Sequence, residues 1–116
     1  LEKGEGEAAR LFPEFKKTYL DKFNEAAVNR AGYQLMSARR LKEAIAVLKL
    51  NVDAHPESAN VYDSLAEAYM NSGETSLAIT YYKKALEAIP KDPRPDKEFL
   101  DQLKKGAEEK LKALEK

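Results

Sequence analysis

The chain has 116 residues, of which 43% are apolar and 34% are charged, with 20 basic residues balanced by 20 acidic ones. This length favours one domain with a modest core, and the apolar content argues against wholesale disorder. Balanced charge gives no field that would attract nucleic acid or an anionic membrane, and the absence of cysteine excludes disulfides, thiol catalysis and thiolate zinc sites.

The compartment of the protein stays open at this level. No apolar run approaches the ~20 residues of a membrane span, so we expect none. The chain begins at Leu1 rather than at a methionine, and we therefore expect it to be a segment from which any targeting peptide has been removed.

The first part of the chain predicts a lead-in followed by a capping helix. Residues 1–11 are polar and contain two glycines, which is typical of a lead-in. Pro13 suits the first turn of a helix over residues 12–23. That helix carries an aromatic stripe at spacings of three and four, made of Phe12, Phe15, Tyr19 and Phe23. We interpret the stripe as a packing face of an N-terminal capping helix, because Glu14 and Lys17 stand where the repeat described below would need an aromatic residue and an alanine.

Residues 25–58 predict a pair of helices, with Asn24 as the N-cap of the first. The first helix is expected to run from Glu25 to about Ser37 and the second from about Arg40 to Val52. The small and apolar residues that recur at helical spacing are Val28, Ala31, Gly32, Leu35, Ala44 and Leu48. Arg39 falls at the turn between the helices, and Asn51 stands where a small residue is expected.

Residues 59–92 repeat this arrangement 34 positions later. Two short helices are joined at Gly73 and closed by Pro90, and Ala78 and Pro90 lie one period after Ala44 and Pro56. The apolar residues at helical spacing are Tyr62, Leu65, Ala66, Tyr69, Ala78, Tyr82 and Ala85. The chain therefore contains an internal repeat of two helices.

A last helix is predicted over residues 96–114, where Asp96 serves as the N-cap after three prolines. Its apolar stripe consists of Phe99, Leu103, Ala107, Leu111 and Leu114. It begins where a third repeat would begin and then runs on without a turn. This is typical of the terminal cap of a helical stack.

The repeated stretch resembles the tetratricopeptide repeat, whose pattern is Trp-x2-Leu-Gly-x2-Tyr, then Ala-x3-Phe and then Pro, with a period of 34. The matching residues are Tyr62, Leu65, Ala66, Tyr69, Ala78, Tyr82 and Pro90. The resemblance implies an all-α, solenoid-like helical-repeat domain over residues 1–116, with repeats at 25–58 and 59–92 between two capping helices. It also implies that the chain binds a protein or a peptide.

Catalytic chemistry finds no support in the sequence. His55 is the only histidine, which leaves no second one for a metal cluster or a proton relay. The glycines near the N-terminus lack the strand-to-helix context of a phosphate loop. We therefore expect no enzyme activity, no cofactor and no metal.

In the tetratricopeptide family, the outward face of each repeat's first helix lines a concave groove for peptides. The resemblance places the following residues at this groove: Asn29, Tyr33, Met36, Ser37, Asn60, Asp63, Ser64, Glu67, Met70 and Asn71, with Lys97, Asp101 and Lys104 continuing the line. Ordinary polar helix surface is the alternative for these positions. The carboxylate clamp of one chaperone-binding subclass is not expected, because Arg94 alone is of the right type.

A second resemblance concerns a longer parent protein. Residues 48–65 are similar to repeat tails behind catalytic domains of bacterial serine hydrolases and esterases. The alternative function is therefore a structural accessory tail that stacks on such a domain or self-associates, without binding a free peptide.

Overall fold

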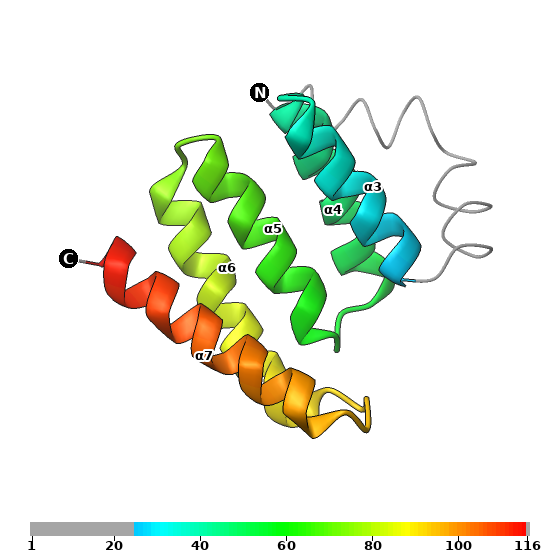
Figure 1. The fold of residues 1–116 in the computed structure, drawn as a ribbon, viewed down its shortest axis with the longest axis vertical. Coiled ribbons are helices and arrows are strands. Elements are labelled where there is room, and N and C mark those ends of the chain that lie inside the picture. The colour runs from blue at the N-terminus through cyan, green and yellow to red at the C-terminus, as the bar shows by residue number, and fades with distance from the viewer. Residues whose placement is uncertain (1–24, 116) are drawn as a thin grey trace. The chain divides into compact units, whose positions relative to one another are not determined.

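The computed structural model describes residues 25–115, so the predicted lead-in, the capping helix over 12–23 and the Asn24 cap lie outside the described part. The described residues form helices and no strand, which confirms the all-α class. The helices are α3 (Glu25–Ser37), α4 (Leu41–Ala54), α5 (Ala59–Asn71), α6 (Thr75–Ala88), the short 3-10 helix η2 (Ile89–Lys91) and α7 (Lys97–Leu114) (Figure 1). The chain divides into two compact units, unit 1 (Leu1–His55) and unit 2 (Pro56–Lys116).

In unit 1, α3 and α4 pack closely because Gly32 has no side chain. A Cβ at this position would lie 2.5 Å from Cδ2 of Leu48 on α4. At the other end of the pair, the side-chain amide of Asn51 donates to the carbonyl oxygen of Glu25 at 3.2 Å. Asn51 is fully buried, so the residue that departs from the repeat pattern supplies a bond between the two helices.

The turns after α3 and after α5 have the same geometry. Arg39 and Gly73 both have a positive φ, of 64° and 83°. In each turn, the following backbone N–H closes back on the carbonyl five residues earlier: Arg40 on Leu35, and Glu74 on Tyr69, both at 2.9 Å. This is the Schellman helix end, which glycine adopts most readily. Arg39 therefore occupies, in the turn after α3, the left-handed position that glycine occupies in the turn after α5.

In unit 2, α5 and α7 both pack on α6 (Figure 1). Ala66 on α5 and Ala78 on α6 are fully buried, and Tyr82 on α6 is 1% exposed. The start of α7 closes a second cluster, in which Leu100 packs against Ala59 and Ala88. Leu100 was absent from the predicted stripe of α7, whose members Phe99, Leu103 and Leu114 are only half-buried.

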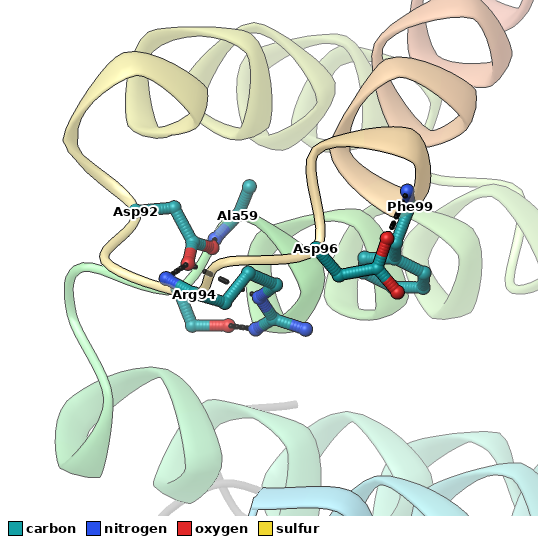
Figure 2. Close-up of polar contacts among 6 residues, drawn as sticks. Ala59, Asp92, Arg94, Asp96 and Phe99 are labelled. Carbon is teal, nitrogen blue, oxygen red and sulfur yellow. Dashed lines mark hydrogen bonds and ion pairs between the residues drawn. The ribbon is translucent and has the colours of Figure 1, made fainter.

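The loop between α6 and α7 is bonded to the start of α5 (Figure 2). The backbone N–H of Ala59 donates to Oδ2 of Asp92 at 2.9 Å, and the N–H of Arg94 donates to Oδ1 at 3.0 Å. The Arg94 guanidinium also bonds to Asp92 and to the Ser58 hydroxyl. Burial of Asp92 opposes its charge, but these bonds outweigh burial and hold its pKa below its usual range.

Asp96 caps α7 as predicted. Its Oδ1 accepts a hydrogen bond from the backbone N–H of Phe99 at 3.0 Å (Figure 2). The Arg94 guanidinium lies 5.0 Å from the centre of the Phe99 ring, so the cap and the loop support each other. The helix accordingly begins at Lys97.

Candidate functional site

Five of the predicted groove residues form one face of α5, because they follow each other at helical spacing. Asn60, Asp63, Glu67 and Met70 are half-buried, and Asn71 at the end of the helix is exposed. We call these five residues the α5 face. Ser64 does not belong to it, contrary to the prediction, because Ser64 is only 1% exposed.

Asp63 is the residue of the α5 face whose electrostatics stand out. Its partial burial, together with the charge of Glu67 one turn later, raises its pKa to about 6, and the positive charge of Lys110 acts in the opposite direction. The pKa of Tyr82 on α6 is also raised, first by burial and then by the charges of Asp63 and Glu67. The α5 face therefore carries two carboxylates one helical turn apart, whose charges disfavour ionisation of the Tyr82 phenol.

The α7 residues predicted to continue this line are Lys97, Asp101 and Lys104, and all three are exposed. Asp101 precedes Lys110 by nine residues, which is about two and a half turns of a helix, so the two residues lie on opposite sides of α7. The Lys110 ammonium group lies 6.0 Å from the centre of the Tyr82 ring on α6. Asp101 therefore lies on the side of α7 away from Tyr82, and the charges that act on Asp63 come from Glu67 and Lys110.

In unit 1, the predicted groove residues lie on α3. Asn29 and Tyr33 are half-buried and Ser37 is exposed. Met36 is only 7% exposed, so it offers little surface to a ligand. The side-chain oxygen of Asn29 is buried without a hydrogen-bond partner in the described part of the chain. Tyr33 is thus the residue of this helix best placed to give an apolar contact.

A small hollow of about 140 Å³ lies elsewhere on unit 2. Its lining includes Pro56, Tyr62 and Ala88 with the charged Lys84, Glu87 and Lys91. Apart from the wall given by Tyr62, it draws on α6 and the loops rather than on the α5 face. Its volume suits one side chain and not a peptide.

Comparison with protein families decides what these helices are. The family model described as tetratricopeptide repeat matches residues 35–97, which is more than half of the chain. The chain belongs to the tetratricopeptide repeat family. Comparison with curated proteins and with solved structures returned no match.

Membership of the tetratricopeptide repeat family carries a broad functional meaning. Such repeats serve in protein–protein interaction or as scaffolds, and they are typically non-catalytic. The hydrolase and esterase tails that residues 48–65 resemble find no support in the comparisons. No helix within residues 25–115 has both the length and the apolarity needed to cross a membrane.

The contacts that sequence reasoning missed involve the loop and the last helix of this tetratricopeptide chain. Arg94, the one residue of clamp type, is bonded to Asp92 and Ser58 within its own unit. Lys110 covers Tyr82, and Lys83 on α6 pairs with Glu115 at 3.1 Å. The family pattern gives no signal for Lys110 or Glu115, because α7 continues beyond the length of a repeat's first helix.

Proposed function

We propose that the chain binds a peptide, or a segment of a larger protein, along the first helix of each repeat, in the concave groove typical of tetratricopeptide repeats. The observation that carries this proposal is the α5 face, where Asn60, Asp63, Glu67 and Met70 are half-buried and Asn71 is exposed along one side of the helix. Repeats over residues 25–58 and 59–92, with a terminal helix over 96–114, are part of the proposal.

The chemistry of the two helices indicates what the ligand presents. Asp63 and Glu67 favour a basic group, since both are negatively charged on one side of α5. Tyr33 on α3 and Met70 on α5 offer apolar contact surface, which is enriched at binding faces. The ligand is therefore a segment with an apolar anchor and at least one lysine or arginine.

Such a ligand is bound weakly. Two repeats offer less contact area than a standard protein–protein interface, so we expect a Kd on the order of micromolar. Part of the affinity is electrostatic and weakens with added salt, because exposed charges are screened. The apolar part does not.

The test is a peptide-array screen followed by affinity measurement on selected peptides. Glu67→Lys is expected to weaken binding and to reduce its salt dependence, whereas Tyr33→Ala weakens binding at all salt concentrations. Glu108→Lys, on the exposed side of α7, is the matched control and leaves binding unchanged. Circular dichroism checks that each variant is folded.

The outcome that would overturn the proposal is equally specific. If peptides bind wild type and all three variants alike, neither the α5 face nor Tyr33 is the contact surface. The chain would then fit the alternative of a structural accessory tail that stacks on a larger protein or self-associates. Light scattering of the isolated chain distinguishes self-association from the other case.

A further inference from the structure

Leu77 on α6 is the only large apolar residue within residues 25–115 that is exposed, with 38% of its surface open to solvent. It begins a line along one side of the helix, because Tyr81, Lys84 and Ala88 follow it at intervals of four, three and four residues. We call these four residues the α6 stripe. A single exposed leucine is ordinary on a protein surface, so Leu77 alone indicates no partner.

The other end of the α6 stripe opens into the hollow of about 140 Å³ on unit 2, since Ala88 belongs to both. Tyr62 forms a wall of this hollow and is held on two sides. Its hydroxyl donates to the carbonyl oxygen of Pro56 at 2.8 Å, and its ring stacks on the ring of Tyr81 with 6.5 Å between the centroids. The hollow is therefore preformed rather than shaped by a ligand.

The hollow has room for one leucine side chain. An apolar cavity of about 150 Å³ accommodates a benzene molecule, which has more carbon atoms than that side chain. Leu77 cannot fill the hollow of its own chain, because Ala88 lies eleven residues later, about 16 Å along the helix. An exposed leucine and a recess of matching size thus lie at opposite ends of one stripe.

The charges that flank the α6 stripe are opposite in sign. Glu74 stands at the N-cap of α6, three residues before Leu77, and Lys91 lines the hollow, three residues after Ala88. Both side chains are exposed, and Lys91 forms no ion pair among residues 25–115. Because the two spacings are equal, an antiparallel pair of α6 helices with Leu77 opposite Ala88 sets Glu74 opposite Lys91 at both ends.

We propose that the α6 stripe is a self-association surface, on which a second copy of this chain packs with its α6 antiparallel to the first. A twofold axis across the middle of the stripe places Leu77 of each copy in the hollow of the other and Glu74 of each beside Lys91 of the other. At the centre, Tyr81 meets Lys84 of the second copy. This contact repeats one within the chain, where the Lys84 ammonium group lies 5.9 Å from the centre of the Tyr81 ring. A self-complementary patch of this kind closes into a dimer and does not extend into a filament.

The first experiment measures self-association of the full chain by sedimentation equilibrium, over a concentration range of about 10 μM to 1 mM. The contact area is below that of standard protein–protein interfaces, so we expect a dimer with a Kd on the order of 100 μM. Leu77→Ala empties the hollow and is expected to weaken the dimer by at least about tenfold. Leu77→Met keeps the volume of the side chain and is the matched control, with a Kd close to that of wild type.

Two charge reversals test the antiparallel arrangement. Glu74→Lys alone and Lys91→Glu alone each set like charges against each other at both ends of the dimer, so each variant is expected to dimerise about tenfold more weakly than wild type. An equimolar mixture of the two variants restores both opposite pairs and is expected to form a heterodimer about as tightly as wild type forms its homodimer. A defect in folding would not be repaired by mixing.

A wild-type chain that stays monomeric over the whole range would overturn the proposal in favour of an occupant from another protein. Equal Kd values for wild type and Leu77→Ala would overturn the role of the α6 stripe, and a mixture that associates no better than its components would overturn the twofold arrangement. The α6 stripe shares no residue with the α5 face, so this inference goes beyond the proposed function. Leu77→Ala is accordingly expected to leave peptide binding unchanged.

Discussion

Arg39 holds a backbone conformation that is unfavourable for any residue with a side chain. Its φ of 64° lies in the left-handed region, which costs about 1–2 kcal/mol outside glycine. We expect Arg39→Gly to raise the free energy of unfolding by about 0.5–1 kcal/mol, after allowance for the extra entropy of glycine in the unfolded chain. Urea unfolding followed by circular dichroism measures the difference.

The matched control is the turn of the second repeat. Gly73→Ala has open space around it and a φ of 83°, so its cost is one of backbone conformation alone, about 1 kcal/mol. If Arg39→Gly destabilised the protein, the contacts of the Arg39 side chain would have to stabilise the fold by more than its backbone strain costs.

Asp63 makes stability depend on pH in an unusual direction. The folded protein holds a proton on Asp63 up to about pH 6, whereas the unfolded chain releases it near the ordinary value of 3.8. Folding therefore takes up a proton between these values, and stability falls as the pH rises from about 4 to 7, by up to about 3 kcal/mol. Asp63→Asn is expected to be more stable than wild type at pH 7.5.

The test compares urea unfolding of wild type and Asp63→Asn at pH 5.0 and pH 7.5, with the exposed Asp101→Asn as control. The advantage of Asp63→Asn shrinks at the lower pH. Asp92 acts in the opposite sense, since its lowered pKa makes its contribution disappear as the pH falls below about 4. An advantage that is equal at both pH values would contradict the pKa of Asp63.

At the scale of residues, the sequence predicted which residues lie along the α5 face but not their burial or their pKa values. Asp63 and Glu67 fall on one side of a helix by spacing alone. Ser64 follows Asp63 directly, and a polar residue gives no sign that it will be buried. The pKa of Asp63 depends on burial and on the charge of Lys110 as well as on Glu67, and burial and Lys110 act on it only through the packing of the helices.

At the scale of helices, two glycine-to-alanine substitutions separate two effects: close packing between helices at Gly32 and helix propensity at Gly106. Gly32→Ala places a Cβ 2.5 Å from the Leu48 side chain, so we expect it to destabilise the protein by about 1–3 kcal/mol. Gly106→Ala meets nothing within 4 Å on α7 and is expected to stabilise it by about 1 kcal/mol. Thermal melts of both variants give opposite shifts in Tm. A Tm that does not fall in Gly32→Ala would show that the Leu48 side chain moves aside without cost, and a lower Tm in Gly106→Ala would contradict the expected gain in helix propensity.

Helix bounds followed closely from local signals. The predicted limits of α3 match those observed, and α7 ends at Leu114 as expected. The reason is that caps, glycines and prolines act within a few residues of a helix end. The burial of Leu100 was missed because it depends on Ala59 and Ala88, which the sequence does not mark as neighbours of α7.

At the scale of the whole molecule, α7 completes a stack that has few helices. Deleting residues 97–116 removes Leu100 from its cluster and uncovers Ala59 and Ala88. We expect aggregation or a much lower Tm, since a short helical stack has few interfaces to lose. Leu100→Ala is the graded variant, with an expected loss of about 2–5 kcal/mol. Light scattering and melting curves measure both, and a truncated chain that stays monomeric with an unchanged Tm would show α7 to be dispensable.

The family and the all-α class could be predicted because the spacing of the pattern residues and their period of 34 are visible in the sequence itself. The ligand could not. A groove position is defined by its place on a helix, and Met36 shows that such a position can be buried. Recognition depends on side chains brought together by packing, as with Asp63 and Tyr82.

The bond between Asp92 and Ala59 joins residues 33 positions apart and has a mechanical meaning. When the two ends of the chain are pulled, we expect the tension to pass across this bond. The segment that contains α5 and α6 is then closed off between Ala59 and Asp92 and carries no tension. The enclosed segment adds no length to the pulled chain until the Asp92–Ala59 bond and the supporting Arg94 contacts break. It then releases about 115 Å of extended chain at once. In an optical trap, wild type would show one long step, and Asp92→Ala would lengthen at lower force through shorter ones.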